Sequence, residues 1–559
     1  MMRRPRSTTT ALVAGMASLS LFLTGCTGTE NADASAGSDG MINYLNFGDF
    51  GGGTSPKANY NPFLPAFKLS ATDYVHERLM IVEGTKCREV PWLAKSYEWT
   101  DPKTLEFDIR EGVKWNDGKP FTAKDVAFTF DMIKEHEALD SFGVWGSDLE
   151  SVKATGDNKV TFSFSKPGAT AFTRINEVLI VPEHIWGKVK DPTTFTNAKN
   201  PVGTGPFTVK SLNPRRLVIE RNPDYWQADK VKVKEIRFNK ADSGGQVEQL
   251  KLSRGEYDQQ GQFIPDIKKS YVDRDPKHHK YWYAPGGAIS IYMNLTKKPF
   301  DDTDFRRALT TAFDDKTVIR KAQLGYVKEA SQTGLVVPGQ EQWLPEGIED
   351  QGRIAYDPKA ADKALTKAGY KKDSQGRRLG KNGKPISFSF KVPGEWTDWV
   401  ASADIVIKNL ESLGFEVEKE TPSPDAAIED RSTGQYDMTF GVHGGSCNMY
   451  NNFSDPLNSE RTAPIGKKAL SNEVRWKDAK TDELLADLKA ATSEKDQKKA
   501  VAGLTRVMTD DVPMIPIWYG AKWFQYKTTK AVGWPSAENP YASASDPLLW
   551  MTHLKPAKD

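Results

Sequence analysis

The stretch LAKSYEWTDPKTLEFDIREGVKWNDGKPFTAKDVAFTF, residues 93–130, carries the strongest local signals in this 559-residue chain. Leu105, Phe107 and Ile109 alternate with polar residues, and this period of two predicts a half-buried strand. Asp101-Pro102, just before that strand, is typical of a tight turn. The first half of the stretch therefore predicts a β-hairpin.

The second half of the same stretch predicts a helix. Thr122 is a good N-cap, and Asp125 three residues later completes a capping-box-like start. Val126, Phe130 and Ile133 follow at i, i+4 and i+7, so that one face of the helix is apolar.

This hairpin-and-helix stretch resembles the signature of the family 5 extracellular solute-binding proteins of ABC importers. Members of that family carry oligopeptides, dipeptides, nickel complexes and, in one branch, cello-oligosaccharides. The similarity covers essentially the whole mature chain and continues at GTGPF (203–207), RNPDYW (221–226), MN (293–294), PFDD (299–302), FRRAL (305–309) and YDP (356–358). Trp115, Trp226 and Phe305 within these motifs are expected to be core or turn residues rather than ligand contacts.

The resemblance implies an α/β, bilobal periplasmic-binding-protein-like fold of type II, cluster C, that closes on its ligand and performs no chemistry. Several domains are also expected from length alone, because one hydrophobic core stops growing at about 250–300 residues. The expected division is lobe I from 41–88, 202–285 and 525–559, an inserted subdomain at 89–201, and lobe II at 286–524. We expect a monomer whose partners are a small solute and the transmembrane subunits of an ABC permease.

The N-terminus predicts export and lipidation. Basic residues precede an apolar run, 11–23, that is shorter than the ~20 residues needed to span a bilayer, which is typical of a signal peptide. The following Leu23-Thr24-Gly25-Cys26 resembles a lipobox, so Cys26 is expected to carry a lipid anchor on the outer face of the membrane. Residues 27–40 are small, polar or acidic, and predict a flexible tether.

Composition argues against several other classes of function. The 76 basic and 74 acidic residues are interspersed, which disfavours a nucleic-acid-binding face. The seven histidines show no ligand spacing, so we expect neither a metal nor a cofactor. Cys87 and Cys447 could form one bridge or remain two buried thiols, and the sequence leaves both open.

The class of ligand is the main open question. Peptide-binding members of the family hold the peptide's α-ammonium with an Asp in a segment reading roughly Trp-x-Ala-Asp-Tyr-x-Asp-Pro. The corresponding segment, 436–456, has His443 in place of the Trp and no acid after it until Asp455. A desolvated ammonium needs a buried counter-charge, so this segment favours a neutral ligand.

An oligosaccharide needs neutral amides and hydroxyls for its hydroxyl groups, and aromatic faces for its pyranose rings. Trp396 and Trp399 precede or begin an amphipathic helix and are the first candidates for stacking. The other candidate ligand-binding residues are Asn448, Tyr450, Asn452, Asn61, Trp518 and Trp534.

The sequence therefore predicts a lipid-anchored binding protein for an oligosaccharide of the β-gluco type. The alternative within the family is an oligopeptide, for which Asp437 or Asp455 would have to turn inward. Outside the family, a surface glycoside hydrolase would need two carboxylates converging in a cleft. An adhesion lipoprotein would need no pocket.

Overall fold

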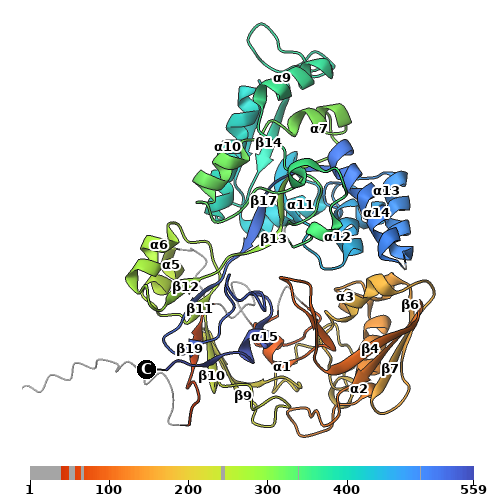
Figure 1. Cartoon of the computed structure of the whole chain (residues 1–559), viewed down its shortest axis with the longest axis vertical. Coiled ribbons are helices and arrows are strands. Elements are labelled where there is room, and N and C mark those ends of the chain that lie inside the picture. The colour runs from red at the N-terminus through yellow and green to blue at the C-terminus, as the bar shows by residue number, and fades with distance from the viewer. Residues whose placement is uncertain are drawn as a thin grey trace, which may run out of the picture.

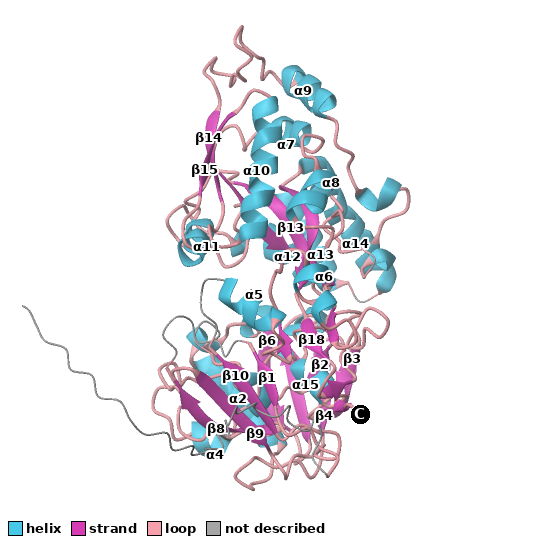
Figure 2. Cartoon of the chain, turned by 90° about the vertical axis from the view of Figure 1, so that its left-hand side faces the viewer, coloured by secondary structure: helices cyan, strands magenta, loops and turns pink. Residues whose placement is uncertain are grey.

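The computed structural model describes residues 39–48, 57–64, 68–240, 246–337, 339–491 and 493–558. The predicted signal peptide, Cys26 and most of the tether lie outside these residues. Two large sheets divide the molecule into two lobes stacked along its long axis (Figures 1 and 2). Both predictions of fold class, α/β and bilobal, are confirmed.

Lobe I is built on a seven-stranded sheet that gathers distant parts of the chain. Its order is β12 (His279–Tyr281), β18 (Gln525–Lys527), β11 (Gln259–Gln260), β1 (Leu45–Phe47), β10 (Glu235–Asn239), β9 (Arg216–Arg221) and β8 (Phe207–Asn213). The helices of this lobe are α1 (Thr72–Val75), α5 (Gln246–Ser253), α6 (Ile267–Ser270) and α15 (Pro547–Met551). Helices α5 and α6 lie at the end of lobe I that faces lobe II (Figures 1 and 2). Two short antiparallel pairs of strands, β2 (Met80–Val82) with β3 (Glu89–Pro91) and β19 (Ala531–Val532) with β20 (Lys555–Pro556), complete it.

A four-stranded antiparallel sheet forms a subdomain beside lobe I, in the order β4 (Ala94–Asp101), β5 (Thr104–Ile109), β7 (Lys159–Phe164) and β6 (Leu149–Ala154). Its helices are α2 (Ala123–Glu135), α3 (Phe172–Ile175) and α4 (Glu183–Trp186). The predicted hairpin is confirmed, and alternate residues of β5 are buried. The predicted helix is confirmed as well, with the Thr122–Asp125 capping box formed and Val126, Phe130 and Ile133 buried. The buried side chains of subdomain and lobe I form one continuous core.

Lobe II is built on a five-stranded sheet in the order β15 (Glu416–Glu420), β14 (Ser387–Lys391), β16 (Met438–His443), β13 (Ala284–Met293) and β17 (Met514–Lys522). Two large hydrophobic cores and one small cluster lie among the described residues of this lobe. Its helices are α7 (Thr303–Leu309), α8 (Asp315–Thr317), α9 (Pro358–Lys367), α10 (Thr397–Ser412), α11 (Pro424–Thr433), α12 (Met449–Leu457), α13 (Ala479–Ala490) and α14 (Glu494–Arg506).

The chain passes between the lobes on neighbouring strands. β12 belongs to lobe I and β13 to lobe II, and the return runs from β17 in lobe II to β18 in lobe I. β13 and β17 are paired antiparallel up to the point of crossing, where Ala284 faces Lys522. In addition, Cys87 of lobe I and Cys447 of lobe II form a disulfide, which decides between the two possibilities that the sequence left open.

We predict that Phe130→Ala weakens the core shared by the subdomain and lobe I. The Phe130 ring is fully buried, with its centroid 4.9 Å from that of Phe162. Removing a buried Phe side chain costs about 3–5 kcal/mol, which urea unfolding followed by circular dichroism will measure. Phe142→Ala is the matched control, because the Phe142 side chain is 36% exposed. Equal losses of stability in the two variants would contradict this assignment of the core.

Candidate ligand-binding cavity

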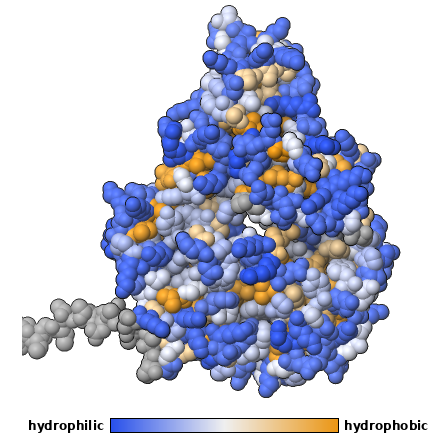
Figure 3. All heavy atoms as spheres, viewed as in Figure 1, coloured by the Kyte–Doolittle hydropathy of each residue, from blue (hydrophilic) through white to orange (hydrophobic). Residues whose placement is uncertain are grey.

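A cavity of about 640 Å³ lies between the lobes, beside the crossing strands. Lobe I contributes residues from α5 and from the loop after β11, and lobe II contributes the start of α10 together with parts of β13, β16 and β17. The molecule is hollowed between its lobes in the space-filling view as well (Figure 3). The lining residues are Gln249, Gln262, Phe263, Ile289, Gln323, Glu395, Trp396, Thr397, Asp398, Trp399, Val442, Trp518, Gly520, Ala521 and Trp523.

Aromatic rings form the lobe II wall. Trp396 is the residue immediately before α10 and Trp399 lies in the first turn of that helix, as the sequence predicted. Their ring centroids are 4.8 Å apart in an edge-on arrangement. Trp399 packs in turn on Phe440, which packs on Trp518. Trp399 and Trp518 are therefore anchored in the core of lobe II, while Trp396 is half-buried and leaves part of its ring open.

A second group of rings lines the cavity near the crossing strands. Phe263 follows β11, and Trp523 lies on the return from lobe II to lobe I. Their centroids are 5.5 Å apart, and Tyr283 packs edge-on against Trp523 at 4.7 Å. Rings from both lobes thus border the same space, and such rings present large apolar faces.

Two side-chain amides at the cavity have unused hydrogen-bonding capacity. Gln323 donates through Nε2 to Ser402 Oγ at 3.0 Å, while its Oε1 is buried without a partner among the described residues. The backbone of Gln262 exchanges hydrogen bonds with the Gln525 side chain. Gln262 Nε2 is likewise buried without a partner in this part of the chain. Two residues of the cavity lining thus each hold one buried amide atom without a partner, an acceptor in Gln323 and a donor in Gln262, and buried polar groups of this kind are costly unless something binds them.

The charged residues among those lining the cavity are two carboxylates, Glu395 and Asp398. Glu395 is exposed, whereas Asp398 is more enclosed and burial raises the pKa of its carboxyl. The lining residues include no Lys, Arg or His, so the described wall offers no cation to an anionic ligand.

The structure brings three of the predicted binding residues together, Trp396, Trp399 and Trp518. Asn448, Tyr450 and Asn452 do not line this cavity. Asn448 instead caps α12 and donates to the Thr170 carbonyl oxygen at 3.1 Å. Asn452 is buried and donates to the Gly334 carbonyl oxygen, and Tyr450 packs on the second core of lobe II.

Asn61 and Trp534 lie in the interior of lobe I, away from the cavity lining. Asn61 Nδ2 donates to the carbonyl oxygens of Pro192 and Phe195 at 3.0 and 2.8 Å. The Trp534 indole donates to the Ala531 carbonyl oxygen at 2.9 Å, and its ring packs on Trp550. The polar groups of both side chains thus form hydrogen bonds with the backbone of lobe I and its subdomain.

The two acids required by the peptide alternative are also engaged elsewhere. Asp437 accepts a hydrogen bond from Lys297 Nζ at 2.6 Å and another from the Ser389 backbone at 3.0 Å. Asp455 pairs with Arg461 at 3.2 Å and lies 3.8 Å from Arg174.

Sequence patterns do not single out the glutamines of the cavity. Gln249, Gln262 and Gln323 come from three separated segments, and only the glutamine-rich run at 259–262 hints at a polar surface. Trp523 and Phe524 are adjacent aromatic residues, and the sequence alone does not show which of the two rings faces a cavity. Phe524 is fully buried, whereas Trp523 lines the cavity.

Among the described residues, no cluster of three or more His, Cys, Asp or Glu could hold a metal ion. In the same part of the chain, no helix combines the length and apolar character needed to cross a membrane.

Two lobes joined by paired crossing strands, with an aromatic and amide-lined cavity between them, define a bilobal solute-binding protein. The family model for bacterial extracellular solute-binding proteins, family 5, matches residues 88–464, and the chain belongs to this family. The chain is 24% identical to the oligopeptide-binding protein AppA of Bacillus subtilis, over 92% of this chain and 94% of that protein.

Solved structures show the same fold. A periplasmic oligopeptide-binding protein of an ABC transporter from Thermotoga maritima superposes with a TM-score of 0.84 at 27% identity, covering 92% of this chain and 99% of that one. The structure of the same Thermotoga protein with mannohexaose bound gives a TM-score of 0.80 at 27% identity, with the same coverage. The chain is thus similar to the substrate-binding proteins of ABC importers.

His443, at the end of β16 beside Val442 of the cavity wall, should make stability depend on pH. Burial lowers the pKa of His443 from 6.5 to about 4. Between these values the unfolded chain binds a proton that the folded chain does not, so stability falls as the pH falls from 6.5 toward 4. The loss is about 3 kcal/mol, at about 1.4 kcal/mol per pKa unit.

The variant His443→Asn keeps a polar group near Ser290 Oγ, which lies 3.0 Å from His443 Nδ1. It should lose less stability than the wild type between pH 6.5 and pH 4, as measured by urea unfolding at each pH. Burial also lowers the pKa of His76 to about 4 and raises the pKa of Glu77 to about 7, but both residues are common to the two proteins, so their titration cancels in the comparison. Parallel pH profiles for the two proteins would contradict the prediction.

Proposed function

We propose that this substrate-binding protein captures an oligosaccharide of the β-gluco type in the interlobe cavity and delivers it to an ABC permease. The observation that carries the proposal is the pairing of aromatic walls with a free amide donor and a free amide acceptor, without any basic residue in the lining. Sugar hydroxyls both donate and accept hydrogen bonds, and the C–H faces of pyranose rings pack on aromatic rings.

Each cavity residue has a distinct part in this proposal. Trp396 stacks on a pyranose ring because its ring is the more open one, and Trp399 and Trp518 support it from the core. Gln262 Nε2 and Gln323 Oε1 are buried without partners, and the two side chains turn toward the sugar so that the first donates to one hydroxyl and the second accepts from another. The Thermotoga protein, which is 27% identical to this chain, was solved with mannohexaose bound, and this supports a carbohydrate ligand here.

The alternative is an oligopeptide, and one feature of the cavity favours it. Glu395 and Asp398 border the cavity, so either carboxylate could pair with a peptide's α-ammonium. Relatives named as oligopeptide-binding proteins support the same alternative. Burial raises the pKa of the Asp398 carboxyl, so the charged form that such a pairing needs is the less favoured one at this position.

The proposed transport cycle rests on the bilobal fold and on the predicted N-terminus. A lipid on Cys26 holds the protein at the outer face of the membrane, and residues 27–40 let the lobes reach the permease. The lobes close around the solute by a hinge motion that shields it from water. The protein acts as a monomer that binds and releases its solute without chemical change.

A thermal-shift screen of the protein against cello-, xylo-, manno- and chito-oligosaccharides, alongside a mixed peptide digest, tests the class of ligand. A ligand that binds only the folded state adds about 2.7 kcal/mol of stability at a hundredfold excess over Kd. We expect cello-oligosaccharides to raise Tm by about 2 °C for a chain of this size. A rise with peptides alone would replace the carbohydrate proposal by the peptide alternative.

The variant Trp396→Ala should weaken binding of the sugar that the screen identifies by about 1–3 kcal/mol, because it removes the open stacking face. Isothermal titration calorimetry will give the two affinities. Trp99→Ala is the matched control, since Trp99 packs on Phe164 within the subdomain and does not line the cavity. An unchanged affinity in Trp396→Ala would show that Trp396 does not contribute to binding of the sugar.

A further inference from the structure

We propose that the Cys87–Cys447 disulfide is a third, covalent connection between the lobes, which limits how far the cleft can open. The bond joins residues 360 positions apart in sequence, one in each lobe. This inference goes beyond the proposed function, because it concerns the motion of the lobes and holds for any ligand.

The bond lies beside the two crossings of the chain. A second cavity of about 430 Å³ is lined by Cys87, by Gly287 on the outgoing crossing and by Lys522 on the return. Lys522 Nζ also donates to the Gly84 carbonyl oxygen at 3.5 Å, which ties the return strand to the turn that carries Cys87. The disulfide therefore lies close to the hinge, where a covalent link between the lobes limits how far they can rotate apart.

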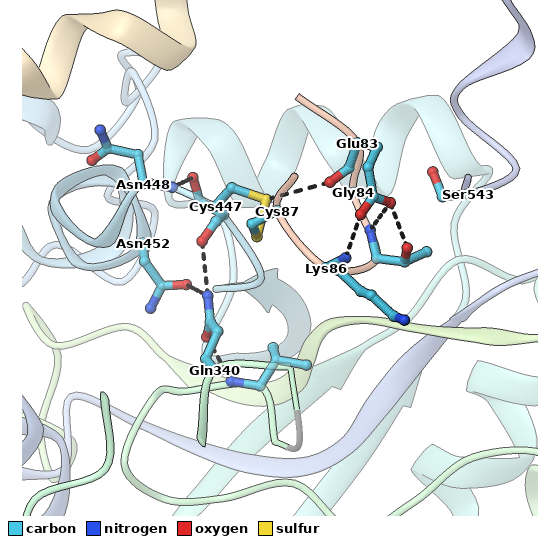
Figure 4. Close-up of a disulfide and its surroundings, with 12 residues drawn as sticks. Glu83, Gly84, Lys86, Cys87, Gln340, Cys447, Asn448, Asn452 and Ser543 are labelled. Carbon is cyan, nitrogen blue, oxygen red and sulfur yellow. Dashed lines mark hydrogen bonds between the residues drawn. A yellow bond between two sulfur atoms is a disulfide. The ribbon is translucent and has the colours of Figure 1, made fainter. Parts of the chain in front are cut away.

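On the lobe II side, the turn that carries Cys447 is packed directly on the outgoing crossing. A Cβ atom on Gly287 would lie 2.8 Å from the His443 carbonyl oxygen and 3.0 Å from that of Gly444. Only glycine at position 287 allows this approach. Gln340 Nε2 holds the same turn by donating to the Ser446 carbonyl oxygen at 2.8 Å and to Asn452 Oδ1 at 3.1 Å (Figure 4).

On the lobe I side, the Glu83 carboxylate organises the turn that carries Cys87. It accepts hydrogen bonds from the backbone of Thr85 at 3.0 Å and of Lys86 at 2.9 Å (Figure 4). The Glu83 backbone also donates to the Arg88 carbonyl oxygen at 2.9 Å, which closes the turn. Each cysteine therefore sits on a turn fixed to its own lobe, so the bond transmits force between two ordered bodies.

The other contacts between the lobes are non-covalent and can break when the cleft opens. On the subdomain side, Arg174 donates to Asn451 Oδ1 through Nε at 3.0 Å. On the cavity side, the Ile267 amide donates to the Tyr326 hydroxyl at 2.8 Å. Water can replace such hydrogen bonds when the lobes separate. Water cannot replace the disulfide, so the covalent link persists while the bond remains oxidised.

Reduction of the bond gives a direct test. A dithiol such as dithiothreitol supplies two electrons and two protons, the S–S bond becomes two thiols, and the dithiol becomes a cyclic disulfide. Cys87 is exposed, so the reagent can reach it without unfolding of the chain. The variants Cys87→Ser, Cys447→Ser and the double variant remove the bond by a second route, and circular dichroism checks their fold.

Small-angle X-ray scattering and hydrogen exchange will report the motion in the protein without added ligand. We expect the reduced protein and all three variants to share a larger radius of gyration than the oxidised protein. Exchange in peptides covering Ile267 should accelerate by about tenfold, because the amide loses its partner in lobe II when the lobes separate.

An equal radius of gyration and equal exchange in oxidised and reduced protein would overturn the proposal, as would free thiols in the exported protein by alkylation and mass spectrometry. If the variants misfold, reduction of the folded wild type decides alone. Neither readout needs a sugar or a peptide, so failure here is distinct from failure of the ligand proposal.

Discussion

The antiparallel pairing of β13 with β17 is the constraint on which the architecture depends. It begins where Ala284 faces Lys522, at the crossing between the lobes, and continues to Tyr292 and Met514 inside lobe II. Irregularities in register after Pro285 and Ile289 bend the pair as it enters the sheet. Because both connections between the lobes run on these two strands, they position each lobe relative to the other.

The same strands divide the space between the lobes into two cavities with different surroundings. Ile289, Trp518 and Gly520 face the larger cavity, together with the aromatic start of α10. Gly287 and Lys522 face the smaller one, which the disulfide borders. One cavity thus carries the aromatic and amide groups suited to a ligand, and the other carries the covalent restraint.

Local signals in the sequence were sufficient where local contacts decide the structure. The hairpin and helix of residues 93–130 depend on alternation and on the Thr122–Asp125 cap, and both formed as predicted. The position of Trp396 before α10 could also be predicted, because the amphipathic pattern marks where the helix begins. The glutamines of the cavity could not be predicted, because Gln262 and Gln323 line the same cavity only after the fold has brought distant segments together.

Asn448 shows why residue type alone does not locate a binding site. An asparagine before a helix suits a sugar hydroxyl and a backbone amide equally well, and here its Oδ1 accepts from the Asn451 amide at 3.2 Å. Its Nδ2 then donates to the Thr170 carbonyl oxygen, so the side chain joins the contacts between lobe II and the subdomain. Trp396 differs because its ring is held at the edge of a helix, where packing on Trp399 fixes its orientation and leaves a face open. A binding residue in this molecule is therefore distinguished by a ring face or a polar group that its neighbours leave uncovered.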